Sequence, residues 1–212
     1  MVSTPVVSSA APNTAFVYPP DLSYLHVPLA TFLESNREYQ HLVVSAFIFH
    51  EQRVLLVQRS ATDYLPGYWE ILGGSCDRED RTILHALQRE VFEETGLRIT
   101  GIVNQIGEGI EFVTGSGTSS ETWAKLSFVV EVEEANEGTE ATQEQEYGGE
   151  GARIEGGSDW TIAIKLSPAE HQRYLWVTKQ EVRTGGAGSV TLKFISQDQQ
   201  DLILAAFSSR KL

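Results

Sequence analysis

The stretch Leu72–Leu97, LGGSCDREDRTILHALQREVFEETGL, decides how the whole chain is interpreted. It holds a pair of glycines, a short acidic loop and a helix-forming segment that ends in REVFEETG. At about 100° per residue, Glu90, Glu93 and Glu94 fall on one helix face. Three like charges so close together repel, so we expect a cation among them. Clustered carboxylates with no His or Cys beside them suit a hard, oxygen-seeking ion, Mg²⁺ or Mn²⁺ rather than zinc.

The alternative is that these glutamates form an ordinary solvated helix face, because acidic helix surfaces are common. Two features favour a binding site. Ile83 and Ala86 share the glutamate face, so the stripe begins apolar and becomes acidic. The glycine pair follows an apolar run, where residues without Cβ let the backbone approach a ligand or adopt positive φ.

The segment resembles the Nudix box, which runs Gly, five residues, Glu, seven residues, and then Arg-Glu-aliphatic-any-Glu-Glu-any-Gly-aliphatic. Arg89 to Leu97 match the second half without a gap. The first half carries one extra residue ahead of the helix. Its acidic position falls on Asp80 when counted from Gly74 and on Glu79 when counted from Gly73.

The resemblance implies an α/β fold, a Nudix-like α/β/α sandwich with a mixed β-sheet. It also implies a Mg²⁺-dependent pyrophosphohydrolase, in which water attacks a phosphorus of a diphosphate. Glu93 and Glu94 would be the main metal ligands, with Glu90 as a ligand or water-orienting base and the Gly73 carbonyl completing the shell.

Three further box residues have structural roles in this reading. Arg89 would hold the glutamates or the loop by ion pairing, and Gly74 and Gly96 would be structural positions. Outside the box, Arg59 closes the strand expected over 53–58, and in the resemblance a Gln-Arg pair at this point lies near the substrate phosphates. An ordinary surface ion pair is the alternative for Arg59. Alternation places Glu70 on the metal side of its strand.

Aromatic residues near the box offer surfaces for a nucleoside base. Tyr68, Trp69 and Trp123 are candidates for stacking, although we expect Trp69 to be core. The five histidines show no ligand spacing and Cys76 has no visible catalytic partner, so each is expected to be structural or incidental. These histidines are His26, His41, His50, His85 and His171.

Composition sets outer bounds on function. With 212 residues, 41% hydrophobic content and four Trp, the chain can build one sizeable domain. A single Cys favours a reduced, cytoplasmic setting. The net charge of −13 argues against nucleic-acid and membrane partners and leaves a small-molecule diphosphate, with metal ions offsetting the repulsion. The oligomeric state is left open.

The domain is expected over residues 21–212, after a disordered arm over 1–20 that is rich in Ser, Thr, Ala and Pro. Residues 134–158 are rich in Glu, Gly and Gln and are expected to form a flexible acidic insertion, either passive or a lid. Within it, Glu144 and Glu146 are candidates for a catalytic base. The strands are predicted over 42–49, 53–58, 68–72, 97–106, 109–114, 121–132, 160–166 and 174–177, with helices over 28–36, in the box, from Thr178 and from Ser196 to Ser209.

The predicted function is cleavage of a nucleoside diphosphate linked to another moiety, for example a nucleotide sugar. Few basic residues lie near the box, which argues against a highly phosphorylated substrate such as an inositol pyrophosphate. Two alternatives stay open: a Nudix-fold binding module without catalysis, and a hydrolase of a non-nucleotide diphosphate.

Overall fold

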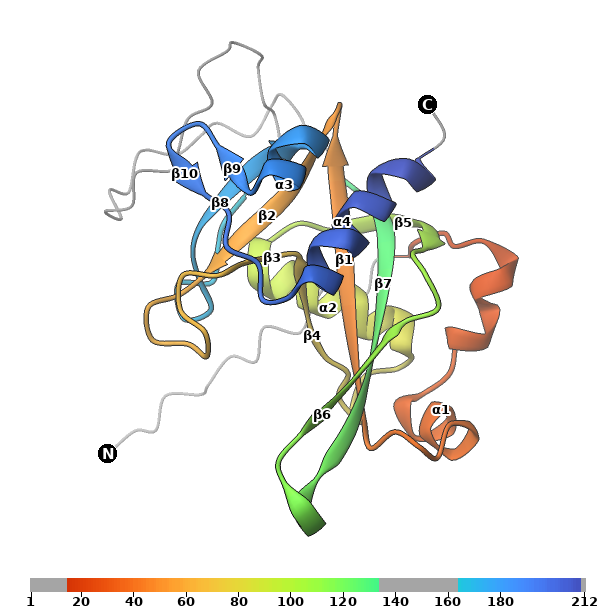
Figure 1. Ribbon diagram of the computed structural model, residues 1–212. Helices are drawn as coiled ribbons and strands as arrows, with labels where there is room; N and C mark the ends of the chain where they lie inside the picture. The colour runs from red at the N-terminus through yellow and green to blue at the C-terminus, as the bar shows by residue number, and fades with distance from the viewer. Residues whose placement is uncertain (1–14, 134–163, 211–212) are drawn as a thin grey trace, which may run out of the picture.

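The structure is a computed structural model that describes residues 15–133 and 164–210. In this part of the chain, a mixed sheet of eight strands forms the centre (Figure 1). The main path of the sheet is β3-β2-β1-β7-β5, while β4 pairs with β1, β6 with β7 and β8 with β2. In chain order the elements are η1 (Pro20–Leu25), α1 (Leu29–Ser35), β1 (His41–His50), β2 (Arg53–Arg59), β3 (Trp69–Glu70), β4 (Leu72–Ser75), α2 (Ile83–Thr95), β5 (Ile99–Gln105), β6 (Ile110–Thr114), η2 (Gly117–Ser119), β7 (Glu121–Val132), β8 (His171–Thr178), α3 (Lys179–Thr184), β9 (Gly186–Ala187), β10 (Val190–Thr191) and α4 (Gln197–Ser209).

Strand β1 lies inside the sheet and is buried on both faces, which explains its unbroken apolar sequence. It runs parallel to β7, with Ser45 opposite Ser127. Val44 packs in the core cluster on one face of the sheet and Phe47 in the cluster on the other. The predicted hairpin between β1 and β2 is confirmed, with His50 opposite Arg53 across the turn.

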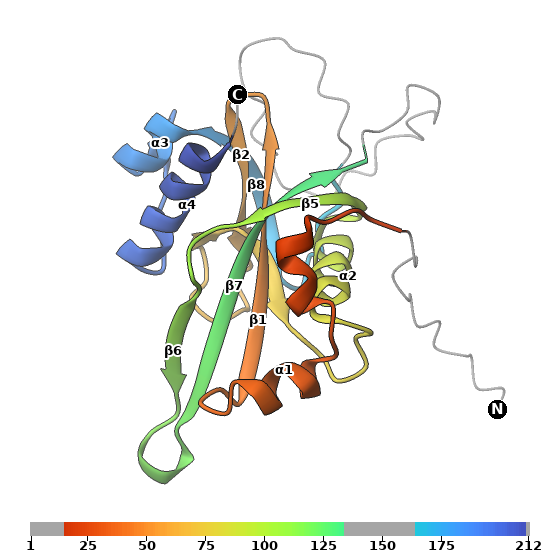
Figure 2. The same cartoon turned by 90° about the vertical axis from the view of Figure 1, so that its right-hand side faces the viewer.

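Helices cover both faces of this sheet. Figure 2 shows α2 on one side of the strands and α3 with α4 on the other. The apolar residues of α2, such as Leu87 and Val91, share a core cluster with Val44, whereas Ile203 and Ala206 of α4 join the cluster of the opposite face. The predicted α/β sandwich with a mixed sheet is therefore confirmed.

The predicted helix starts also hold. Thr178 accepts a hydrogen bond from the backbone N–H of Glu181, whose side chain accepts from the N–H of Thr178, so the capping box forms. Ser196 caps α4 by accepting from the N–H of Gln199. The box helix α2 ends at a glycine. Gly96 adopts φ 72° and its N–H donates to the carbonyl of Phe92, which forms a left-handed cap that favours glycine.

The strand predicted over 68–72 is wrong in one respect, because the chain there forms two strands with different partners. Strands β1 and β2 pair only next to their hairpin turn and then diverge. The following chain enters the gap between them: β3 pairs with β2 and β4 pairs with β1. Ile71 alone separates β3 from β4.

The predicted arm over 1–20 also needs correction at its end. Phe16 and Tyr18 pack against the core, and Val17 forms a β-bridge with Gly101. Apolar side chains at alternate positions let this short segment bury one face. The remainder of the arm, over 1–14, lies outside the described residues.

The later part of the chain departs from prediction at one more point. Of the strand predicted over 160–166, the first four residues lie outside the described part of the chain, and residues 164–166 form no strand. The predicted acidic insertion, with Glu144 and Glu146, also lies outside it. No helix in the described ranges is long and apolar enough to cross a membrane.

Candidate active site

A polar cavity of about 270 Å³ opens between the box helix α2 and strands β2, β3, β4 and β8. Carboxylates dominate its wall, and most come from segments far apart in sequence. The lining residues are Arg59, Asp63, Glu70, Gly73, Gly74, Ser75, Glu90, Glu94, Glu170 and His171. The structure thus brings two of the three box glutamates together with strands that lie before and after the helix in the sequence.

Glu94 is the most enclosed of these carboxylates, with 4% of its surface exposed. It accepts a hydrogen bond of 2.8 Å from the N–H of Gly73. Burial raises the pKa of Glu94 well above its ordinary value; the Gly73 N–H opposes the shift and the charges of Glu90 and Glu170 add to it. An ionised Glu94 therefore needs a cation beside it.

Glu90 lies next to Glu94 and is also largely buried. Burial raises its pKa to about 7, although the neighbouring Arg89 guanidinium favours the ionised form. Glu93 differs, because 41% of its side chain is exposed and its carboxylate pairs with Arg89 at 3.0 Å. Glu93 therefore lies at the rim, outside the cavity lining.

The glycine pair permits this close packing of helix and strand. Gly73 has φ 142°, and a Cβ there would lie 2.1 Å from the carbonyl oxygen of Val44 on β1. A Cβ on Gly74 would lie 2.5 Å from Oε2 of Glu90. A side chain at residue 73 would therefore clash with the backbone of β1, and one at residue 74 would displace the Glu90 carboxylate, so this strand must pass between β1 and α2 as bare backbone. The structure shows the N–H of Gly73 engaged by Glu94; a metal contact of its carbonyl stays a prediction.

Arg89 ties the acidic loop to the helix. Its guanidinium donates to both carboxylate oxygens of Asp80 at 2.9 Å, to Glu90 at 2.8 Å and to Glu93 at 3.0 Å. It also donates to the carbonyl of Ser75 at 3.0 Å. Of the two acidic positions that the sequence left open, Arg89 contacts Asp80 and not Glu79.

On the other side of the cavity, Arg59 holds Glu70. One guanidinium nitrogen of Arg59 donates to both oxygens of Glu70, at 2.8 and 3.0 Å, and another pairs with Asp63. Burial by itself would raise the pKa of Glu70, but hydrogen bonding from His171 and the positive charges of Arg59 and Lys125 outweigh it and lower that pKa. Arg59 and Glu70 thus both line the cavity. Their predicted contact with a substrate stays a prediction.

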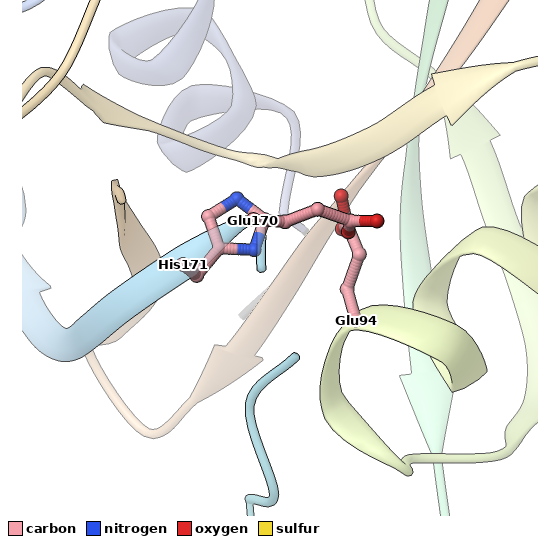
Figure 3. A group of neighbouring side chains, drawn as sticks. All are labelled: Glu94, Glu170 and His171. Carbon is pink, nitrogen blue, oxygen red and sulfur yellow. The ribbon is translucent and has the colours of Figure 1, made fainter. Parts of the chain in front are cut away.

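The sequence did not predict a place in the site for three residues of this region. Glu170 and His171 stand where β8 begins, and Figure 3 shows their side chains pointing toward that of Glu94. Each of the three offers one ligand atom, and these atoms lie within 4.8 Å of one another. Lys125, on β7, is the third: burial lowers its pKa, while the charges of Glu70 and Glu94 oppose that shift.

The only sequence signal for Glu170 and His171 was a Glu-His pair just before an apolar strand. They reach the site through the pairing of β8 with β2, in which His171 lies opposite Arg59. The expectation that His171 is structural or incidental did not anticipate this position.

The candidate stacking residues do not line the cavity. Trp69 is fully buried in the core, as expected. Tyr68 has the ammonium group of Lys193 at 4.1 Å from its ring centroid. Trp123 stacks on His41, with ring centroids 4.0 Å apart.

An α/β/α sandwich with an acidic helix packed over a glycine pair is the architecture of a Nudix domain. The sequence matches the NUDIX domain family over residues 39–155. The chain belongs to the Nudix family, and it is a hydrolase that acts on phosphoric anhydrides. Glu170 and His171 lie beyond the matched residues.

Several solved structures are similar to this chain. A Nudix hydrolase from Nitrosomonas europaea is 16% identical with a TM-score of 0.50, covering 81% of this chain and 90% of its own. A MutT protein from Methanosarcina mazei Go1 is 20% identical with a TM-score of 0.49, covering 79% and 92%. A MutT Nudix hydrolase from Burkholderia pseudomallei is 13% identical with a TM-score of 0.48, covering 78% and 96%. Among proteins with curated descriptions, none matches the chain significantly.

Nudix hydrolases generally use divalent metal ions, and the residues of this cavity fit one. Glu90, Glu94 and Glu170 face it with oxygen ligands, and the buried carboxylate of Glu94 has no cationic side chain bound to it among the described residues. Hard divalent cations take such ligands. Burial, with a smaller contribution from neighbouring carboxylates, raises the pKa values of Glu90 and Glu94, so a cation in the cavity would favour their ionised forms.

Proposed function

We propose that this enzyme is a Mg²⁺- or Mn²⁺-dependent pyrophosphohydrolase that cleaves a nucleoside diphosphate linked to another moiety, such as a nucleotide sugar. The observation that carries the proposal is the convergence of Glu90, Glu94 and Glu170 on one cavity that also holds the Arg59 guanidinium. Carboxylates alone would repel an anionic diphosphate. With divalent cations they become a site for it.

Each residue of the cavity has a definite part in this proposal. Glu94, Glu90 and Glu170 bind the cation, and Glu93 adds a ligand at the rim. The N–H of Gly73 orients the Glu94 carboxylate, and Arg89 holds that of Glu90. A bound divalent cation would lower the pKa of a water molecule and neutralise charge on the phosphate oxygens.

Arg59 is the cavity-lining guanidinium, and Glu70 and Asp63 fix its orientation. We propose that it contacts a phosphate oxygen, since its planar fork matches phosphate geometry. Glu90 faces the same cavity beside Glu94, so it suits a ligand or a water-orienting base.

The size of the cavity bears on the substrate. A volume of about 270 Å³ takes a diphosphate with its cations, so the groups on either side of it extend beyond the cavity. Arg59 and Arg89 both pair with carboxylates, which leaves little positive charge for phosphates beyond those of a diphosphate. A compact diphosphate suits this balance better than an inositol pyrophosphate.

A substrate panel at fixed Mg²⁺ tests the proposal. Phosphorus-containing products are measured for ADP-ribose, nucleotide sugars, nucleoside triphosphates and an inositol pyrophosphate, with Glu94→Gln as the inactive control. We expect a nucleotide diphosphate derivative to be cleaved fastest. Preferential cleavage of the inositol pyrophosphate would overturn the substrate class, and metal-independent binding without turnover would favour a binding module.

The setting of the enzyme is also a proposal. We place it in the cytoplasm, acting on a small molecule and not on nucleic acid, because of its acidic composition and its one cysteine, which is free and buried.

A further inference from the structure

The His171 imidazole has one ring nitrogen engaged and one without a partner. The residue is 4% exposed, and its Nε2 lies 3.4 Å from Oε1 of Glu70. Its Nδ1 is buried and has no hydrogen-bond partner within residues 15–133 and 164–210. Buried polar atoms are nearly always satisfied, so this nitrogen calls for a ligand.

Glu70 determines which nitrogen carries the proton. Its carboxylate accepts two hydrogen bonds from Arg59, which keeps it in the acceptor form. A carboxylate of this kind pairs with an N–H, so Nε2 carries the hydrogen of the neutral ring. The lone pair then lies on Nδ1. A carboxylate that orients a histidine in this way is the common support of histidine ligands in metal sites.

The neighbours of the ring complete a ligand set. Carboxylate oxygens of Glu94 and Glu170 and one nitrogen of His171 lie within 4.8 Å of one another (Figure 3). Around an ion with ligands at about 2.1–2.2 Å, neighbouring ligand atoms are about 3.0 Å apart and opposite ones about 4.3 Å, so side-chain rotations that draw the three atoms together bring them into contact with one cation.

We propose that His171, through Nδ1, ligates a divalent cation shared with Glu94 and Glu170, and that this nitrogen ligand makes the position prefer Mn²⁺ to Mg²⁺. The proposal rests on the metal site of the proposed function. Imidazole suits transition ions, whereas Mg²⁺ keeps to oxygen ligands and water. The sequence pointed to an all-oxygen site because no histidine stands beside the box glutamates; the fold supplies one from β8.

Pulsed electron paramagnetic resonance of bound Mn²⁺ tests the ligand directly. We expect the full-length wild-type protein with Mn²⁺ and no substrate to show ¹⁴N coupling of a ligated imidazole. His171→Asn should lose the coupling, and the matched variant of an exposed histidine, His26→Asn, should keep it. Bound Mn²⁺ without ¹⁴N coupling in the wild type would overturn the proposal, and that measurement requires no variant to fold.

Calorimetric titrations give the second readout. His171→Asn places an amide oxygen near the former Nδ1, so we expect Mn²⁺ affinity to fall by about tenfold or more, while Mg²⁺ affinity changes little. An unchanged Mn²⁺-to-Mg²⁺ affinity ratio contradicts the nitrogen ligand. Metal-dependent hydrolysis that persists without ¹⁴N coupling leaves the proposed function standing and removes only this inference, whereas a wild-type protein that binds neither ion removes both.

Discussion

The backbone of Gly74 lies directly against the carboxylate of Glu90, so a Cβ at residue 74 would be 2.5 Å from Oε2 of Glu90. Gly74→Ala should therefore push this carboxylate out of the cavity. We expect metal affinity to fall by about tenfold or more, as when a supporting group of a metal site is lost, with the fold retained. Calorimetry with Mn²⁺ and circular dichroism measure the two effects.

Gly186→Ala is the matched control for this change. A Cβ at Gly186 would meet its nearest atom, the carbonyl oxygen of Val190, at an ordinary 3.7 Å. Equal effects of the two alanines on metal affinity would show that the contact between Gly74 and Glu90 is not what matters.

The two remaining glutamates of the helix should differ in importance. Glu94→Gln removes a buried charge that faces the cavity, so we expect turnover to fall by at least about a hundredfold. Glu93→Gln acts at the rim and should cost less. Steady-state kinetics at saturating Mg²⁺ rank the two variants, and a greater loss for Glu93→Gln would reverse their assignment.

Without metal, Glu94→Gln should melt at a higher temperature than the wild type. The amide keeps the hydrogen bond from Gly73 while it removes a buried negative charge. A clear drop in melting temperature in the presence of a chelator would contradict this account of the raised pKa.

The raised pKa of Glu90 has a definite consequence for stability. Burial makes the folded protein hold the Glu90 proton up to about pH 7, whereas the unfolded chain releases it near 4.5. The folded state therefore binds more protons within this window, and its stability falls as the pH rises from about 4.5 to about 7. Thermal melts of the metal-free protein across this range measure the slope.

Glu90→Gln provides the comparison for that experiment. The amide does not titrate, so the variant should lose stability less steeply over the same pH window. Saturating Mg²⁺ should also flatten the wild-type slope, because the cation favours the ionised carboxylate. Parallel slopes for wild type and variant would assign the effect to other groups.

The identity of the first acidic box position is testable through Arg89. Asp80→Asn weakens a charged, bidentate pair, and we expect a loss of about 1.5–3 kcal/mol in the free energy of unfolding. Glu79→Gln, next door and exposed, should change it little. Urea denaturation of both variants decides between the two positions. A larger loss of stability for Glu79→Gln than for Asp80→Asn would place the first acidic position of the box at Glu79.

Sequence patterns predicted those parts of the site that depend on local spacing. The 3.6-residue period placed Glu90 and Glu94 together, and the Gly-Gly pair indicated a close backbone approach. The period did not predict that Glu93 would lie at the rim, because Arg89 and the packing of α2 on the sheet set the rotation of the helix.

The other half of the site depends on long-range strand pairing. His171 reaches Glu94 because β8 pairs with β2, and no local pattern records that partnership. The division between β3 and β4 was missed for the same reason. It arises from the divergence of β1 and β2, which becomes visible only when the sheet is assembled.

That division leaves Ile71 as the single residue between β3 and β4. Glu70 lies on β3, which pairs with the strand of Arg59, and that strand also pairs with the strand of His171. Gly73 lies on β4, which pairs with β1, beside Glu94 of the helix. Side chains alternate along a strand, so one residue inserted after Ile71 would shift either β3 or β4 by one position in its ladder. Every strand could still pair, yet Glu70 and Gly73 would no longer face the same space. The alignment of the cavity-lining groups thus depends on the length of the chain at one buried position, as well as on the chemistry of the glutamates.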